Sequence, residues 1–131
     1  MNPLTYEWVA KAEADLLTAR REYRARKAPN YDAVCFHAQQ AVEKYLKALL
    51  QEWGIPIPRI HSLMELLAII SKSDAGSLLI QTDANVLETY AVQFRDPGVS
   101  ANKFEAKQAL DASGRICSLI RMKLDKTQGA S

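Results

Sequence analysis

The sequence predicts an all-α protein, an up-and-down bundle of four to five helices. Two observations support this fold class. Apolar residues recur at three- and four-residue steps in five segments, and no segment shows the two-residue alternation of a half-buried strand. The longest segment, Asn30–Gly54, is apolar over so much of its surface that we expect it to be the central helix, packed against several others.

The composition is that of one folded domain. With 131 residues the chain can enclose a hydrophobic core, and 48% hydrophobic with 24% charged residues argues against disorder. The net charge of +2 gives no overall attraction to nucleic acid. We therefore expect a single helical domain over residues 1–125 and a flexible tail over residues 126–131.

The first helix is predicted to begin at Asn2 and Pro3, a capping residue followed by a first-turn proline. Its C-terminal end is basic. The cations there are Arg20, Arg21, Arg24, Arg26 and Lys27. A solvated helix end that suits the helix dipole is the favoured interpretation, and a surface facing phosphate or RNA is the alternative.

The central helix begins after the capping residue Asn30 and ends at Gly54. It carries an apolar stripe and, at the same spacing, a polar one. The apolar stripe consists of Val34, Ala38, Val42, Tyr45, Leu49 and Trp53, and the polar stripe of His37, Gln40, Lys44, Lys47 and Gln51. The polar stripe is either solvated or part of a site, and Glu43 and Lys47 are spaced to form an ion pair.

Three shorter patterns complete the bundle. Ser62 begins a third helix that ends by Ser73, and a polar linker over residues 72–77 follows. The fourth helix covers residues 80–95, because the Pro-Gly pair after it cannot continue a helix. The fifth runs from Asn102 to about residue 124. Small side chains (Ala106, Ala109, Ala112 and Ser113) form one face of it, which suits close approach of another backbone and favours a homodimer.

Several classes of site receive no support from the sequence. Cys35 and Cys117 lack a CxxC spacing and are expected to be free, buried thiols. His37 and His61 have no second ligand at helical spacing, so we predict no metal site and no cofactor. Neither a signal peptide nor a membrane-length apolar run is visible, so we expect no membrane association and a cytoplasmic location.

Two places could bind an anion. The first is the loop from Tyr90 to Asn102, where Arg95 and Asp96 lie at a helix end and the next helix begins with unpaired N–H groups. In the alternative interpretation this loop only ends one helix and starts the next, and Arg95 pairs with Asp96 or caps backbone carbonyls. The second place is the polar stripe, where His37, Lys44 and Lys47 could contact a phosphate. The favoured interpretation is a solvated helix face, or an interhelix hydrogen bond for His37.

Four stretches together resemble the HEPN family, named for higher eukaryotes and prokaryotes nucleotide-binding. They are the first-helix pattern from Trp8 to Ala19, the block CFHAQQAVEKYLKALL at Cys35–Leu50, His61-Ser62-Leu63, and Tyr90 to Pro97. The resemblance implies a helical bundle that usually forms a homodimer. It also implies a partner protein, a minimal nucleotidyltransferase, with which many members form a toxin–antitoxin pair. Active members are metal-independent RNases.

The family's RNases use an arginine, a spacer of four to six residues and a histidine. Arg95 matches the arginine, but Ser100, Ala101 and Asn102 stand where the histidine is expected. The resemblance therefore implies a non-catalytic dimeric module that binds a protein partner, and nucleotide or RNA near Arg95. Two alternatives stay open: an RNase toxin whose base, His37 or His61, comes from elsewhere, and a small-ligand or nucleotide-binding bundle.

Overall fold

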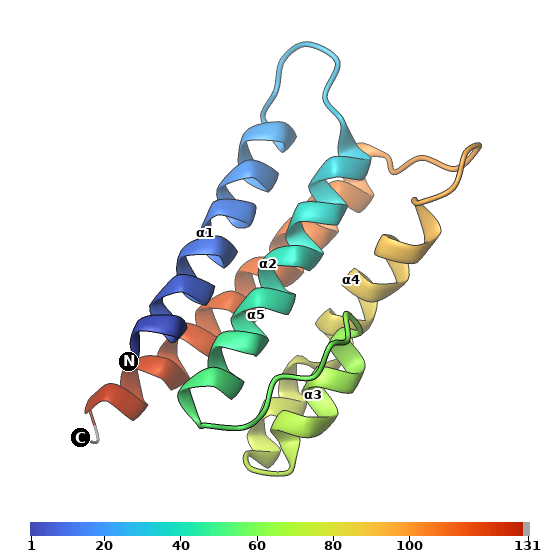
Figure 1. Cartoon of the computed structure of the whole chain (residues 1–131). Coiled ribbons are helices and arrows are strands. Elements are labelled where there is room, and N and C mark those ends of the chain that lie inside the picture. Colours follow the sequence, from blue (N-terminus) through green and yellow to red (C-terminus); the bar gives the residue numbers. More distant parts are fainter. Residues whose placement is uncertain (130–131) are drawn as a thin grey trace.

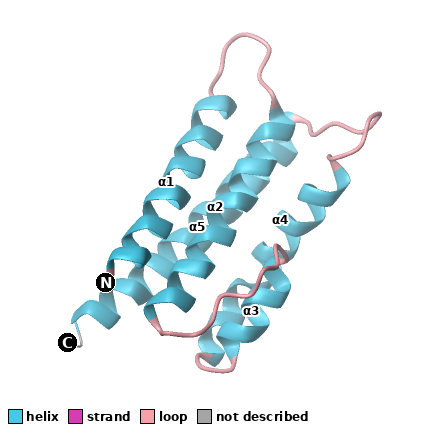
Figure 2. Ribbon diagram, in the orientation of Figure 1, coloured by secondary structure: helices cyan, strands magenta, loops and turns pink. Residues whose placement is uncertain are grey.

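The structure is a computed structural model that describes the backbone of residues 1–129 and the side-chain environments of residues 1–126. No strand occurs among these residues, so the predicted all-α class is confirmed (Figure 2). In chain order the elements are α1 (Pro3–Tyr23), α2 (Tyr31–Glu52), α3 (Leu63–Ser71), the 3-10 helix η1 (Ala75–Ile80), α4 (Gln81–Gln93) and α5 (Lys103–Gly129).

The helices alternate in direction along the chain, with α1, α2, α4 and α5 running up and down in turn (Figure 1). The long helices α1, α2 and α5 lie side by side, and the shorter α3 and α4 stand next to them. Helix α2 packs against α1, α3, α4 and α5, which confirms its predicted central position. The N-terminus and the C-terminal part of α5 lie at the same end of the bundle.

Local capping signals fix where the helices begin. The side-chain oxygens of Asn2, Asn30 and Ser62 each accept the backbone N–H three residues later, at 2.9, 3.0 and 3.2 Å. At the start of α5, Asn102 accepts the backbone N–H of Glu105 at 2.8 Å, and the Glu105 carboxylate accepts that of Asn102 at 2.9 Å. This reciprocal arrangement is a complete capping box, as the sequence predicts.

The small-residue face of α5 packs inside the molecule. Ala106, Ala109 and Ser113 have no exposed surface, and the Ser113 hydroxyl donates to the Ala38 carbonyl of α2 at 3.0 Å. Small side chains let the α5 backbone approach α2 closely, and this contact uses the face within the subunit. The expectation that this face supports a dimer is therefore wrong.

Helix α1 ends at Tyr23 with Arg20 and Arg21 in its last turn, so its C-terminal end is basic as predicted, and the chain then turns at Ala28, whose φ is 44°. Two other boundaries differ from prediction. The predicted polar linker is partly helical, since Asp74 caps η1 by accepting the Gly76 N–H at 3.0 Å. Helix α5 continues to Gly129, beyond the predicted end near residue 124, because no proline interrupts it. Residues 130–131 of the predicted tail lie outside the described part.

Both cysteines are free and buried, as predicted, and burial raises the pKa of each thiol to about 12. Across the described residues, none of the helices combines the length and the apolar character needed to cross a bilayer.

The centre of α2 should dominate stability. Leu49 has no exposed surface, so we expect Leu49→Ala to lower the free energy of unfolding by about 2–5 kcal/mol, through lost transfer energy and a cavity. Leu79→Ala is the matched control, because Leu79 is 85% exposed and should change stability by less than about 0.5 kcal/mol. Urea denaturation measures both, and a similar small loss in the two variants would show that Leu49 is not a core residue.

Candidate functional site

A cleft of about 650 Å³ opens between α2, α4 and the segment that joins α2 to α3. Phe36 and Gln39 line it from α2, and Tyr90 lines it from α4. Arg95, directly after α4, and His61, directly before α3, also line it. The cleft therefore combines Arg95, the candidate residue from the sequence, with His61, which lies 34 residues earlier in the chain.

Arg95 is exposed and its guanidinium has no carboxylate partner among the described residues. The predicted alternative, in which Arg95 pairs with Asp96, is therefore not what the structure adopts. Gly98, with a φ of 88°, turns the chain away after Asp96 in a conformation that favours glycine. Arg95 stays at the cleft, whereas Asp96 is exposed and does not line it.

The loop after Arg95 is fastened to α2. The backbone N–H of Ala101 donates to the Asp32 carboxylate at 2.6 Å, so a residue at the start of α2 holds the far end of the loop. The Asn102 side chain is committed to the α5 cap, and Asn102 is absent from the cleft lining. The cap also occupies N–H groups at the start of α5, so the predicted contribution of that helix start to anion binding is reduced.

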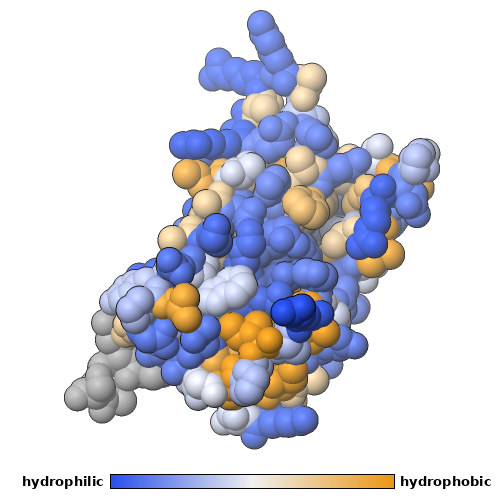
Figure 3. Space-filling model, in the orientation of Figure 1, coloured by the Kyte–Doolittle hydropathy of each residue, from blue (hydrophilic) through white to orange (hydrophobic). Residues whose placement is uncertain are grey.

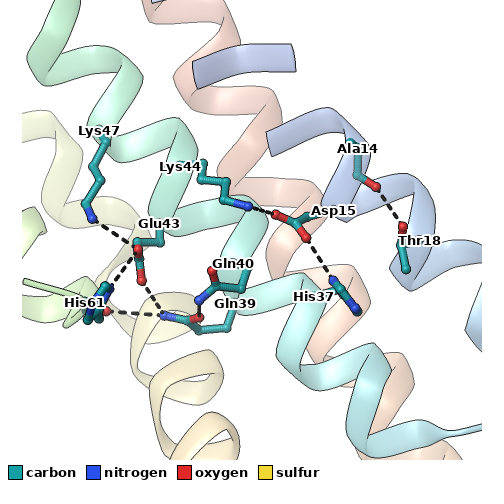
Figure 4. A network of polar contacts seen from close by, with 10 residues as sticks. All are labelled: Ala14, Asp15, Thr18, His37, Gln39, Gln40, Glu43, Lys44, Lys47 and His61. Atoms are coloured by element: carbon teal, nitrogen blue, oxygen red, sulfur yellow. Dashed lines mark hydrogen bonds and ion pairs between the residues drawn. The ribbon is translucent and has the colours of Figure 1, made fainter. Parts of the chain in front are cut away.

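His61 is held in place although its side chain is 84% exposed. Its Nδ1 lies 3.2 Å from Oε2 of Glu43, and its backbone carbonyl accepts the Gln39 amide at 3.3 Å (Figure 4). On its other side, the Leu63 N–H donates to the Glu88 carboxylate of α4 at 2.8 Å. These contacts fix both the backbone and the ring of His61 at the edge of the cleft.

The segment that carries His61 is also anchored by apolar contacts. Figure 3 shows hydrophobic surface over the region between α2 and α3. The three isoleucines of this segment, Ile55, Ile57 and Ile60, are partly buried and pack against the core. Sequestering these side chains from water stabilises the extended segment, and hence the position of the residue that follows it.

The carboxylate that holds His61 is buried. Glu43 is 4% exposed and Lys47 7%, and their charged groups lie 3.1 Å apart. The Gln39 amide lies 3.5 Å from the other Glu43 oxygen, and the Lys47 ammonium stands 5.8 Å from the centre of the Trp8 ring of α1. The predicted ion pair of Glu43 and Lys47 is confirmed, but Lys47 faces the interior and lies apart from the cleft.

Two other residues of the polar stripe, His37 and Lys44, join α1 to α2. His37 Nδ1 lies 2.8 Å from one oxygen of Asp15, and the Lys44 ammonium donates to the other (Figure 4). Neither residue lines the cleft. The structure therefore does not bring His37, Lys44 and Lys47 together with Arg95.

Of the six binding residues named from sequence, only Arg95 lies at the cleft. Sequence reasoning missed Gln39 and the Glu43–His61 contact. One signal could have indicated them: Gln39, Glu43 and Lys47 recur every four residues, which marks a second polar stripe on an otherwise apolar face. In the described part of the chain, no group of three or more His, Cys, Asp or Glu side chains is arranged to hold a metal ion.

The buried ion pair gives a stability prediction. Lys47→Met should lower the free energy of unfolding by about 3–5 kcal/mol, because the Glu43 carboxylate would stay buried without its closest cation. Lys107→Met is the control: Lys107 and Asp111 have the same four-residue spacing but are exposed, so water can replace the pair. Chemical denaturation of both variants measures the difference, and equal losses would contradict the burial argument.

Comparison with known proteins identifies the fold family. The family model described as HEPN domain matches residues 5–123. No curated protein matches significantly. The structure resembles that of an archaeal HEPN homologue, with a TM-score of 0.71, 26% identity, and coverage of 91% of this chain and 96% of the other. It also resembles a protein from Thermus thermophilus, with a TM-score of 0.77, 26% identity, and coverage of 91% and 97%. With the family model covering most of its length, the chain belongs to the HEPN domain family.

Proposed function

We propose that this protein is a dimeric HEPN module that binds a phosphate-bearing ligand, a nucleotide or RNA, in the cleft at Arg95. The observation that carries the proposal is the Arg95 guanidinium, which is exposed, lacks a carboxylate partner among the described residues and lines a 650 Å³ cleft. A planar guanidinium donates two parallel hydrogen bonds to phosphate oxygens, which makes arginine well suited to this ligand class.

The remainder of the cleft suits the organic part of such a ligand. Phe36 is 53% exposed, and Tyr90 packs on Phe94 with ring centres 5.4 Å apart. Aromatic faces accept nucleobases by stacking with little sequence preference. The Gln40 amide also lines the cleft, and the groups that it does not use in its hydrogen bond to Gln39 can hydrogen-bond to a base edge, whereas the Gln39 amide is held by Glu43 and the His61 carbonyl.

Catalysis is not part of this primary proposal, because Ser100, Ala101 and Asn102 replace the histidine of the family's RNase motif. A second function, RNA cleavage, is favoured by one observation: His61 lines the same cleft as Arg95 and contacts a buried carboxylate. In such a reaction His61 takes the proton of a ribose 2′-hydroxyl as that oxygen bonds to phosphorus, and the bond to the 5′-oxygen breaks, with water protonating that oxygen, to give a 2′,3′-cyclic phosphate and a 5′-hydroxyl. Arg95 stabilises the charge on the phosphate.

Binding is tested by replacing Arg95. We expect Arg95→Ala to weaken the binding of labelled single-stranded RNA and of AMP by about tenfold or more, the value of one charge-assisted contact. Arg21→Ala is the control, since Arg21 is an exposed arginine of α1 outside the cleft. Fluorescence anisotropy measures RNA binding and NMR titration measures AMP binding. Equal affinities for the wild type and Arg95→Ala would refute the proposed site.

The same variants separate the two functions. On the primary proposal, the wild type, Arg95→Ala and His61→Ala all leave a mixed RNA substrate intact over hours without metal. Cleavage by the wild type that is lost in both variants would replace the binding proposal with the RNase. Gel analysis of the RNA, with intact-mass measurement of the products, distinguishes these results.

Dimerisation is proposed from the family resemblance, with Arg95 near the two-fold axis. Sedimentation equilibrium at micromolar concentration should give twice the 14.6 kDa subunit mass. A monomer at that concentration would contradict this part of the proposal. The face that forms the contact is not the small-residue face of α5, because that face is buried against α2.

The proposed protein partner is a minimal nucleotidyltransferase, which the family resemblance suggests. Tagged protein expressed together with the product of its neighbouring gene should retain that product through purification, and native mass measurement gives the stoichiometry. If the untagged product of the neighbouring gene elutes without this chain, the proposed partner is wrong.

A further inference from the structure

We propose that His61 is a second phosphate contact of the cleft, and that its protonation makes ligand binding stronger at low pH. The inference rests on the proposed function and adds to it a residue and a form of regulation. Three observations support it: the place of His61 in the cleft, the fixed orientation of its ring, and the charged groups that surround it.

The orientation of the ring leaves one nitrogen for the ligand. Nδ1 of His61 is 3.2 Å from Oε2 of Glu43, so Nε2 is the nitrogen that can face a ligand. The side chain is 84% exposed and lines the cleft that Arg95 also lines. A protonated ring donates from both nitrogens, to Glu43 through Nδ1 and to a phosphate oxygen through Nε2.

Oε2 of Glu43 can accept a hydrogen bond from Nδ1 both in the protonated ring and in the neutral tautomer that carries its hydrogen on Nδ1. The Lys47 ammonium lies 3.1 Å from the same oxygen of Glu43. It therefore compensates the buried charge of Glu43 when the His61 ring is neutral. The arrangement therefore tolerates both states of His61. A phosphate at Nε2 adds a second negative neighbour and shifts the balance toward the protonated ring.

Few other groups around the cleft change charge in the relevant range. Helix α2 contributes Asp32 and Glu43, with Lys47 behind them, and α4 contributes Glu88. Carboxylates and lysines as classes keep their charge between about pH 5 and 8, whereas imidazoles lose a proton there. Arg95 stays protonated by the nature of its guanidinium. Burial raises the pKa of Tyr90 further above this range, so its phenol stays neutral.

The two acids of the rim explain why the additional cation matters. Asp32 accepts the Ala101 N–H and Glu88 accepts the Leu63 N–H, so both are positioned, but both repel a phosphate. Against these two carboxylates Arg95 supplies a single positive charge. Protonation of His61 adds the second, and the cleft then attracts an anion more strongly.

The probe for the test must not titrate or react. A 2′-deoxy dinucleotide with one phosphodiester carries a constant charge from about pH 5.5 to 8.5, whereas the second ionisation of a phosphate monoester falls near pH 6. It also lacks the 2′-hydroxyl that RNA cleavage uses. Isothermal calorimetry on the full chain gives the affinity at each pH, and repeating it in buffers of different ionisation enthalpy gives the protons taken up on binding.

For the wild type we expect affinity to fall about tenfold from about pH 5.5 to 8.5, the size of one charge-assisted hydrogen bond, with proton uptake on binding within this range. His61→Gln should bind at every pH as weakly as the wild type does at the alkaline end, without proton uptake. His61→Lys should restore tight binding across the whole range. His37→Gln is the matched control, because His37 is the other histidine of the chain and pairs with Asp15 outside the cleft.

Each result separates the inference from the function on which it rests. A His61→Gln variant that keeps the pH dependence and proton uptake overturns the role of His61 and leaves the Arg95 site standing. Loss of the pH dependence in His37→Gln overturns it as well. A wild type that binds no probe at any pH in this range overturns both proposals together.

Discussion

The buried Glu43 carboxylate is the constraint on which the rest of this structure depends. Removing a carboxylate from water costs several kcal/mol unless other groups replace its hydration, as a rough general figure. Here Lys47, Gln39 and His61 replace it, and Lys47 in turn stands over Trp8. These partners come from α1, α2 and the segment before α3, so all three must be in place together. No buried side-chain polar atom in the described part of the chain lacks a partner.

The same helix that encloses this charge also organises the cleft. Helix α2 contributes Phe36 and Gln39 to the cleft lining, and through Asp32 it holds the loop that follows Arg95. Through Gln39 and Glu43 it also holds His61. The loop after Arg95 and the ring of His61 are therefore both positioned relative to one rigid element. A site built in this way needs little reorganisation when an anion binds, which favours affinity.

Membership of the HEPN family does not decide what happens in this cleft. The fold is shared with two solved structures at 26% identity over most of the chain, yet function depends on particular side chains in a site. In this chain the loop after Arg95 lacks the imidazole of the RNase motif, and its residues serve structure instead: Ala101 binds Asp32 and Asn102 caps α5. A histidine from another segment lies at the cleft, in a different geometric relation to the arginine.

The sequence by itself determined the class of fold, the central helix and most helix starts, and it singled out Arg95 as a candidate residue. These features depend on interactions within one helical turn, such as a cap and the N–H three residues later, or on the periodicity of apolar residues. Both kinds of signal are local, so a single sequence contains them. Its least accurate results are the linker over residues 72–77, part of which is helical, and the end of α5, where no proline or glycine stop signal marks the boundary near residue 124.

The tertiary structure alone decided which polar residues are buried and which meet at the site. Lys47 and Lys44 look alike in sequence, but one is enclosed beside Glu43 and the other pairs with Asp15 on α1. The contact of His61 with Glu43 spans 18 residues, and that of Ala101 with Asp32 spans 69. Such pairs form only after the helices pack, because the packing angle and register, rather than any local preference, bring those side chains within hydrogen-bond distance.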